Sequence, residues 1–131
     1  MDISAKAKAA HLALRAGAAF AFIYPAVNAW SDPGSWVGYF PPFVLQWGGM
    51  LGLGDMVVLH LFGALEIVLG LWFLYGRKLF YPAALATVLL LAIVLFNLAQ
   101  MQVVFRDLSI AAMTFALMIT HWPSKLLQQP R

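Results

Sequence analysis

Apolar residues follow one another along this chain in long runs, separated by short polar or aromatic segments. The runs lack both the alternation of a half-buried strand and the spaced stripe of an amphipathic helix. About twenty consecutive apolar residues are enough to cross a bilayer as a helix. The pattern therefore predicts an all-α membrane protein with four spans, over residues 9–30, 55–75, 80–100 and 108–122. Pro123 is expected to end the last span.

The one long connection, residues 31–54, is rich in glycine, proline and aromatic residues and has no lysine or arginine. Tryptophan and tyrosine favour the headgroup region, so this segment is predicted to lie on the membrane surface. It could be a lid over the helix ends or only an anchor. Asp32-Pro33-Gly34 is typical of a turn, and Pro41-Pro42 can open a short helix. Because the other connections are short, residues 1–131 are predicted to form one antiparallel up-and-down bundle.

The amino-acid composition disfavours a soluble domain, nucleic-acid binding and thiol chemistry. Of the 131 residues, 63% are hydrophobic and 10% are charged, which is far from the averages of soluble domains. The net charge of +3 does not indicate nucleic acid as a partner, because the basic residues are scattered at segment ends. The chain has no cysteine, which excludes a disulfide, a thiolate metal site and thiol redox chemistry of its own. A redox role would need a bound cofactor or another subunit.

The basic residues predict how the chain is threaded. Of the eight lysines and arginines, only Arg106 falls on one side of the predicted membrane. The other side holds Lys6, Lys8, Arg15, Arg77, Lys78, Lys125 and Arg131. Positive loops stay cytoplasmic, so both termini are expected on the cytoplasmic side of a bacterial-type inner membrane. A cleaved signal peptide is the alternative for the first run, although Arg15, Tyr24 and Pro25 fit its apolar region poorly.

Glu66 lies near the middle of the second predicted span, where a carboxyl group must be paired or mark a site. By the rise of a helix, Arg15 of the first span lies close enough in depth to form an interhelical ion pair with Glu66. The alternatives are that Arg15 snorkels to the headgroups and that Glu66 is protonated and bonded to a neighbouring helix. Gly63 and Gly70 share the face of Glu66, so that face is predicted to be packed.

A stripe of small residues runs along the first span on the side opposite Arg15. Its members are Ala9, Ala13, Gly17 and Ala21. Small residues let two helices approach closely in lipid. If Arg15 turns inward, the stripe is free to meet a second copy or a partner subunit. The chain is therefore expected to form a homo-oligomer or to join other membrane subunits.

A second polar group is predicted near the outer surface, beneath the aromatic connection. Its members are His60, Asn97, Gln100, Arg106 and Asp107, with Asp32 and Asp55 at a similar depth. Hydrogen-bonding groups among aromatic rings suit a quinone headgroup or another amphipathic ligand. The alternative is that these groups satisfy one another, with Arg106 paired to an aspartate and Asn97 bonded to a backbone carbonyl.

The histidines raise the question of a metal or haem site. His11 and His121 are predicted to be neighbours at the cytoplasmic end, whereas His60 is on the other side. One histidine pair without carboxylate or cysteine support is a poor metal site, so none is expected. The sequence also shows no nucleophile–base pair, phosphate loop or paired carboxylates, which disfavours hydrolytic catalysis.

Four segments together resemble the DoxX-like family of small four-helix membrane proteins. They are LALRAG at 12–17, SDPGSWVGYFPP at 31–42, GALEIVLGLWFLYG at 63–76 and FRDLSIAAM at 105–113. The family is named for its association with a membrane thiosulfate:quinone oxidoreductase. The resemblance implies Glu66, Arg106 and Asp107 as functional positions, with Arg15 beside them.

Two functions follow from these expectations. The first is a small integral subunit that binds a hydrophobic, quinone-like ligand or supports a membrane oxidoreductase. In it Glu66 accepts a proton or bonds the ligand, and Arg106 anchors the outer pocket. The second is a non-enzymatic protein that packs against or escorts membrane partners, with purely structural polar residues. The first requires an open pocket that reaches Glu66 or His60, whereas the second expects a filled core.

Overall fold

A computed structural model describes residues 2–123 of the chain. Within that range every regular element is a helix, as the sequence predicted. The elements in chain order are α1 (Ile3–Ser31), α2 (Gly34–Val37), α3 (Pro42–Met50), α4 (Asp55–Tyr75), α5 (Phe80–Phe96), the 3₁₀ turn η1 (Leu98–Gln100) and α6 (Met101–Thr120). Lys125 and Arg131, which contribute to the predicted topology, lie outside the described residues.

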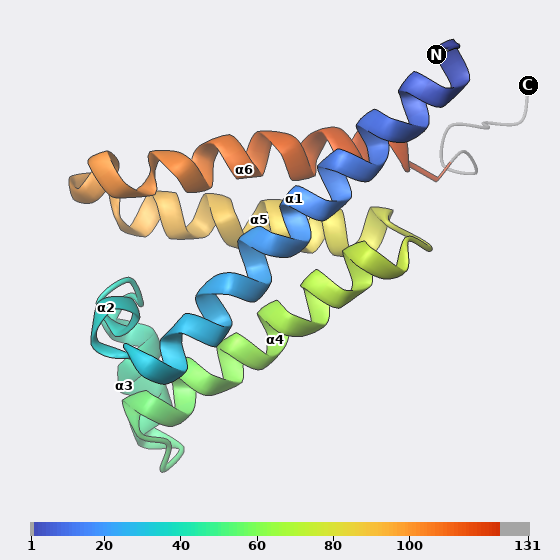
Figure 1. Ribbon diagram of the computed structural model, residues 1–131. Coiled ribbons are helices and arrows are strands. Elements are labelled where there is room, and N and C mark those ends of the chain that lie inside the picture. Colours follow the sequence, from blue (N-terminus) through green and yellow to red (C-terminus); the bar gives the residue numbers. More distant parts are fainter. Residues whose placement is uncertain (1, 124–131) are drawn as a thin grey trace, which may run out of the picture.

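The long helices are arranged as two pairs (Figure 1). α1 packs along α4, and α5 packs along α6. The two pairs touch at the end where α1 begins and α6 ends, and they diverge toward α2 and α3. α1 meets α6, and α4 meets α5, over much shorter stretches. This arrangement leaves space between the pairs at the diverging end.

A small apolar core joins the two pairs. Phe22 of α1 stacks against Phe73 of α4, with ring centroids 6.2 Å apart. Leu79 in the α4–α5 turn and Leu117 of α6 are fully buried in the same cluster. Between α5 and α6 the buried hydroxyl groups of Thr87 and Thr114 are hydrogen-bonded at 2.8 Å. Such a bond satisfies both polar groups where no water is present.

Three segments are long and apolar enough to cross a membrane: α1, α4, and residues Leu98–Thr120. α5, at 17 residues, is a shorter apolar helix. Large apolar side chains on the outer faces are exposed, among them Phe20 at 67%, Val88 at 64% and Leu95 at 67%. Exposed apolar surface of this kind is suited to contact with lipid chains.

The third and fourth predicted spans have different boundaries in the structure. α5 ends at Phe96 instead of residue 100, and α6 begins at Met101 instead of 108. The connection predicted between residues 100 and 108 is therefore misplaced: the chain turns at Asn97 and η1. Asn97 causes the early stop, because its side-chain amide bonds the carbonyl of Ile93 and its backbone leaves the helical region. The residues that follow Met101 in α6 include no glycine or proline to end a helix, so α6 continues through Arg106.

Gly63 and Gly70 of α4 pack against α1, as predicted, whereas Glu66 on the same face lines an open space. A Cβ at Gly63 would lie 3.6 Å from the Cβ of Ala26, an ordinary contact. A Cβ at Gly70 would collide with Ile23 and come within 3.1 Å of the Ala19 carbonyl oxygen. α1 and α4 therefore approach more closely at Gly70 than at Gly63, and a side chain at Gly70 requires α1 to yield.

The small-residue stripe on α1 is partly used inside the chain. Ala9 and Ala13 are exposed. Gly17 lies against Met113 of α6, and Ala21 lines the space between the pairs. The premise that the whole stripe is free for another subunit is therefore wrong.

The connection between α1 and α4 folds over the diverging end of the molecule (Figure 1). Asp32-Pro33 leads into α2, and Pro42 occupies the first turn of α3, where proline is tolerated. The Asn97 side chain also bonds the Tyr39 carbonyl at 3.1 Å, which ties the connection to α5. The Trp36 indole donates to the side chain of Asn28 at 2.9 Å, which ties it to α1.

Candidate functional site

A cavity of about 620 Å³ lies between the two helix pairs, beneath the α1–α4 connection. Its walls come from α1, α4, α5, α6 and the connection itself. Most of the lining is aromatic or aliphatic: Phe20, Phe22, Tyr24, Trp36, Tyr39, Phe40, Phe43, Phe62, Leu90, Ile93 and Phe96 are among its residues. A cavity of this size and character is typical of small-molecule sites, which span about 300–1,000 Å³.

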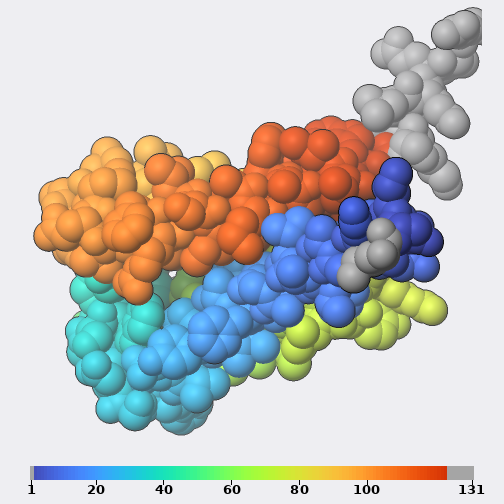
Figure 2. Space-filling model, turned by 45° about the horizontal axis from the view of Figure 1, so that its top comes forward, coloured from blue at the N-terminus to red at the C-terminus, as the bar shows by residue number. Residues whose placement is uncertain are grey.

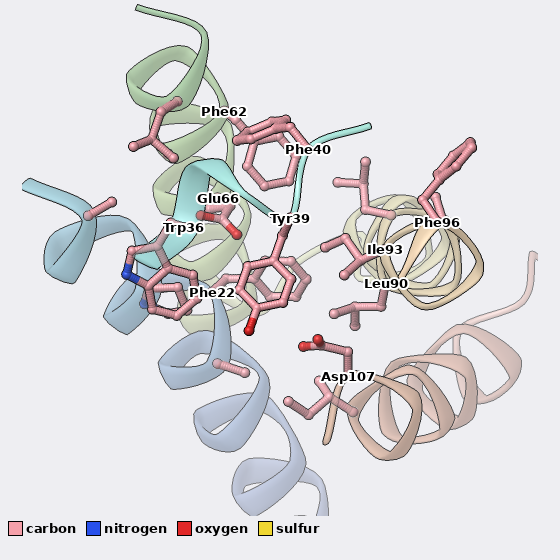
Figure 3. A pocket seen from close by; sticks show the side chains of 18 of the residues that line it. Phe22, Trp36, Tyr39, Phe40, Phe62, Glu66, Leu90, Ile93, Phe96 and Asp107 are labelled. Carbon is pink, nitrogen blue, oxygen red and sulfur yellow. The ribbon is translucent and has the colours of Figure 1, made fainter. Parts of the chain in front are cut away.

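Two carboxyl groups project into this apolar space from opposite helix pairs (Figure 3). Glu66 comes from the middle of α4, and Asp107 from the second turn of α6. Among residues 2–123 no ion pair joins either carboxyl group to a basic side chain. Both groups are thus available to a bound molecule, since a carboxyl group accepts hydrogen bonds when ionised and also donates one when protonated.

A proline interrupts the backbone hydrogen bonding of α1 where that helix lines the cavity. Pro25 lies inside the helix and has no N–H, so it cannot bond the carbonyl of Ala21 one turn earlier. Ala21 and Pro25 both line the cavity. The proline thus weakens the helical hydrogen bonding of α1 at the point where that helix faces the two carboxyl groups.

The cavity reaches the outer surface of the helices. Phe20 and Tyr24 of α1 and Phe96 of α5 line it, yet each is more than half exposed, at 67%, 53% and 55%. Figure 2 shows the surface hollowed where α6, α1 and the connection meet. These exposed rings place the opening of the cavity on the apolar outer faces of α1 and α5.

The structure brings together only part of the predicted outer cluster. Arg106 and Asp107 line the cavity. Glu66, which was predicted to form an ion pair with Arg15 instead, lines it too. Asn97 is 8% exposed and bonds two backbone carbonyls, the structural role given as the alternative. His60 stacks on Trp30, with centroids 4.2 Å apart, and does not line the cavity.

The remaining members of that cluster lie elsewhere. Asp32 accepts a hydrogen bond from Ser35 at 2.6 Å, inside the connection. Asp55 begins α4 and is exposed, as is Gln100 in η1. The Nε of Arg106 donates to the carbonyl of Val103 at 3.4 Å, so the alternative that pairs Arg106 with an aspartate is not observed either.

The predicted ion pair between Arg15 and Glu66 is wrong. Arg15 Nε donates to the Phe73 carbonyl at 2.8 Å, and its Nη2 donates to the Leu74 carbonyl at 2.7 Å. These carbonyls belong to the last turn of α4, where no further turn of helix supplies donors. Arg15 therefore caps α4 from the neighbouring helix, and Glu66 stays with the cavity.

His11 and His121 are neighbours, as predicted, at the end of the molecule opposite the cavity. Their Nε2 atoms are hydrogen-bonded at 2.7 Å, so one ring donates and the other accepts. Among residues 2–123 no group of three or more histidines, cysteines or acidic residues lies close enough to hold a metal ion. The pair thus links the first helix to the last one by a direct hydrogen bond.

This histidine pair predicts a loss of stability in mild acid. Burial and the neighbouring His11 and Arg15 lower the pKa of His121 below its ordinary value of 6.5. The unfolded chain then takes up a proton first as the pH falls through about 6.5, and the folded state is disfavoured. Between pH 7.5 and pH 5.5 the thermal unfolding midpoint of the wild type should therefore fall relative to that of His121→Gln. The same pH dependence of the midpoint in both proteins would contradict the prediction.

Sequence reasoning missed the pairing of Glu66 with Asp107 across one cavity. The two residues were assigned to different depths, because Asp107 was expected at the end of a helix. The absence of glycine and proline between Met101 and Asp107 was the signal that could have placed Asp107 inside α6. It also missed the capping role of Arg15, for which the sequence carries no local signal.

Comparison of the chain with protein-family models, with curated proteins and with solved structures found no match.

Proposed function

We propose that the protein is a small integral membrane subunit that binds a hydrophobic, quinone-like molecule in the cavity between its two helix pairs. Glu66 and Asp107 bond the polar head of that molecule, and the aromatic residues enclose its ring. The single observation that carries the proposal is the open apolar cavity of about 620 Å³ with two carboxyl groups facing into it. A protein whose polar residues were purely structural would fill this space with side chains.

The chemistry of the cavity suits both redox forms of a quinone. A protonated carboxyl group donates to a quinone carbonyl, and an ionised one accepts from a hydroquinone hydroxyl. Glu66 and Asp107 can therefore take up or release protons beside the ring. The chain has no cysteine, so electrons would come from a cofactor or another subunit. The DoxX-like family, which the sequence resembles, is named for its association with a membrane oxidoreductase.

We also propose that all four long helices cross the membrane. α5 lies along α6, so it crosses the same depth and completes a four-span bundle even though it has 17 residues. A short helix can be accommodated by local thinning of the bilayer. Both termini then face the cytoplasm, and the connection that covers the cavity faces outward. The alternative of a packing or escort protein gives no reason for the cavity.

Tryptophan fluorescence tests the proposal with decylubiquinone as the probe. Trp36 lines the cavity, and a quinone bound beside it should quench its emission. We expect saturable quenching in detergent-solubilised protein, and a roughly tenfold weaker affinity in Glu66→Gln, because one hydrogen bond to the headgroup is altered. Native mass spectrometry of the untreated protein should detect a co-purified quinone or lipid-like mass that is reduced in the variant.

Two variants serve as controls. Asp55→Asn removes an exposed carboxylate of α4 outside the cavity and should leave the affinity for decylubiquinone unchanged. Trp36→Phe should abolish most of the saturable quenching without preventing binding, which assigns the signal to the cavity. Equal affinities in the wild type and Glu66→Gln would reject the role of Glu66, whereas no saturable quenching in the wild type would favour the packing or escort function.

A further inference from the structure

A second concave surface lies at the far end of the molecule from the cavity. It is a shallow groove of about 540 Å³ along the last two turns of α4 and the α4–α5 turn. Val68, Leu71, Trp72 and Tyr75 form its wall, at the three- and four-residue spacing of one helix face. Arg77 and Lys78 close its end. The groove is thus apolar along its length and basic at one end.

The α4–α5 turn is built so that both basic residues stand beside this wall. Gly76 ends α4 in the left-handed conformation, with φ of +85°, and its N–H bonds the Trp72 carbonyl at 3.0 Å. The Trp72 indole then donates to the Arg77 carbonyl at 2.8 Å. Lys78 also has a positive backbone angle φ, +51°, which is uncommon for residues other than glycine, asparagine and aspartate. These constraints fix the turn against the groove.

The electrostatic surroundings of the groove are positive. The guanidinium group of Arg15 covers the last carbonyls of α4, which would otherwise present negative charge to a bound anion. Of the five acidic residues only Asp2 belongs to this end of the molecule, and it caps the start of α1. Glu66 and the remaining aspartates lie toward the cavity end or in the connection.

We propose that this groove binds an anionic phospholipid. The phosphate and headgroup lie against Arg77 and Lys78, and one acyl chain follows Leu71 and Val68 down the side of α4. Trp72 and Tyr75 stand at the boundary between these two regions, the level at which aromatic side chains meet headgroups. Val68, Leu71 and Tyr75 are 57%, 55% and 69% exposed, so the wall is open to lipid. The proposal is independent of what the cavity binds.

Native mass spectrometry in mild detergent tests this site with dioleoylphosphatidylglycerol as the probe and dioleoylphosphatidylcholine as the zwitterionic reference. We expect the wild type to prefer the anionic lipid. Arg77→Gln/Lys78→Gln should weaken its binding about 30-fold, the effect of two basic residues near an anionic lipid surface. The matched control is Lys6→Gln/Lys8→Gln, which removes the same charge from the same end outside the groove and should change the affinity little.

A third variant tests the built turn instead of the charge. Trp72→Phe keeps an aromatic ring but loses the bond to the Arg77 carbonyl, and it should weaken binding of the anionic lipid about fivefold. The helical circular dichroism of all these variants should match that of the wild type, which shows that they are folded. Equal losses in the two double variants would reject a specific groove in favour of general attraction. Full displacement by inorganic phosphate would reject the lipid as the ligand.

Discussion

Replacing Arg15 with leucine is expected to lower the free energy of unfolding by about 3 kcal/mol, because two hydrogen bonds from a charged donor are lost. The carbonyl of Phe73, a fully buried residue, would lose its partner, whereas the bond to the Leu74 carbonyl is exposed and contributes less. An unsatisfied backbone group costs most where water is scarce. Unfolding in detergent with increasing sodium dodecyl sulfate, followed by circular dichroism, measures the change.

The same experiment separates the capping role from an ion pair. Lys8→Leu removes the same charge from an exposed position of α1 and should cost little. If Arg15 acts as a cap, the effects of Arg15→Leu and Glu66→Gln should add, because the two side chains do not interact. A large coupling energy between them would mean that Arg15 and Glu66 are paired after all.

Replacing Gly70 with alanine is expected to lower the free energy of unfolding by about 2 kcal/mol, the usual range for an overpacked contact. The new methyl group would lie 2.9 Å from Ile23 Cδ1 and 3.1 Å from the Ala19 carbonyl oxygen. The Ile23 side chain can turn aside, but the backbone of Ala19 can yield only if α1 moves away from α4. The substitution therefore weakens the packing of α1 against α4, which is the most extensive helix contact in the described part of the chain.

Gly63→Ala provides a matched control on the same face of α4. Both substitutions remove a glycine from a helix interior, which by itself favours the helix by about 1 kcal/mol. At Gly63 the methyl group meets Ala26 at ordinary contact distances of 3.6 Å and more. We expect Gly63→Ala to be neutral or stabilising. Similar effects at both positions would show that the two helices do not approach more closely at Gly70 than at Gly63.

The sequence alone predicted the apolar helices and the packed glycines of α4 because both depend on local patterns. The run from Asp55 to Tyr75 has the boundaries that were expected, since Gly54 and Gly76 flank it. Pro42 marked the start of α3, because proline is tolerated in the first turn of a helix. Helix length and glycine spacing are properties of neighbouring residues, and they remain visible without a structure.

The partners of polar side chains could not be predicted in the same way. Depth along a helix suggested Glu66 for Arg15, but depth does not fix the rotation of α1 about its axis. That rotation turns Arg15 to the end of α4 and leaves Glu66 facing α6. An error of a few residues in the start of α6 likewise displaced Asp107 from the cavity. Whether the protein binds a quinone, and whether it belongs with the DoxX-like family, remain predictions.

The pairing of α1 with α4 and of α5 with α6 has a consequence for synthesis of the protein. Everything in the first pair precedes Gly76, and everything in the second follows it. The first hairpin can thus insert and pack while the ribosome is still translating the second. Glu66 lies in the early hairpin and Asp107 in the late one, so the cavity is completed only when the last helix arrives. A nascent chain lacking α6 would contain a folded hairpin but no binding site.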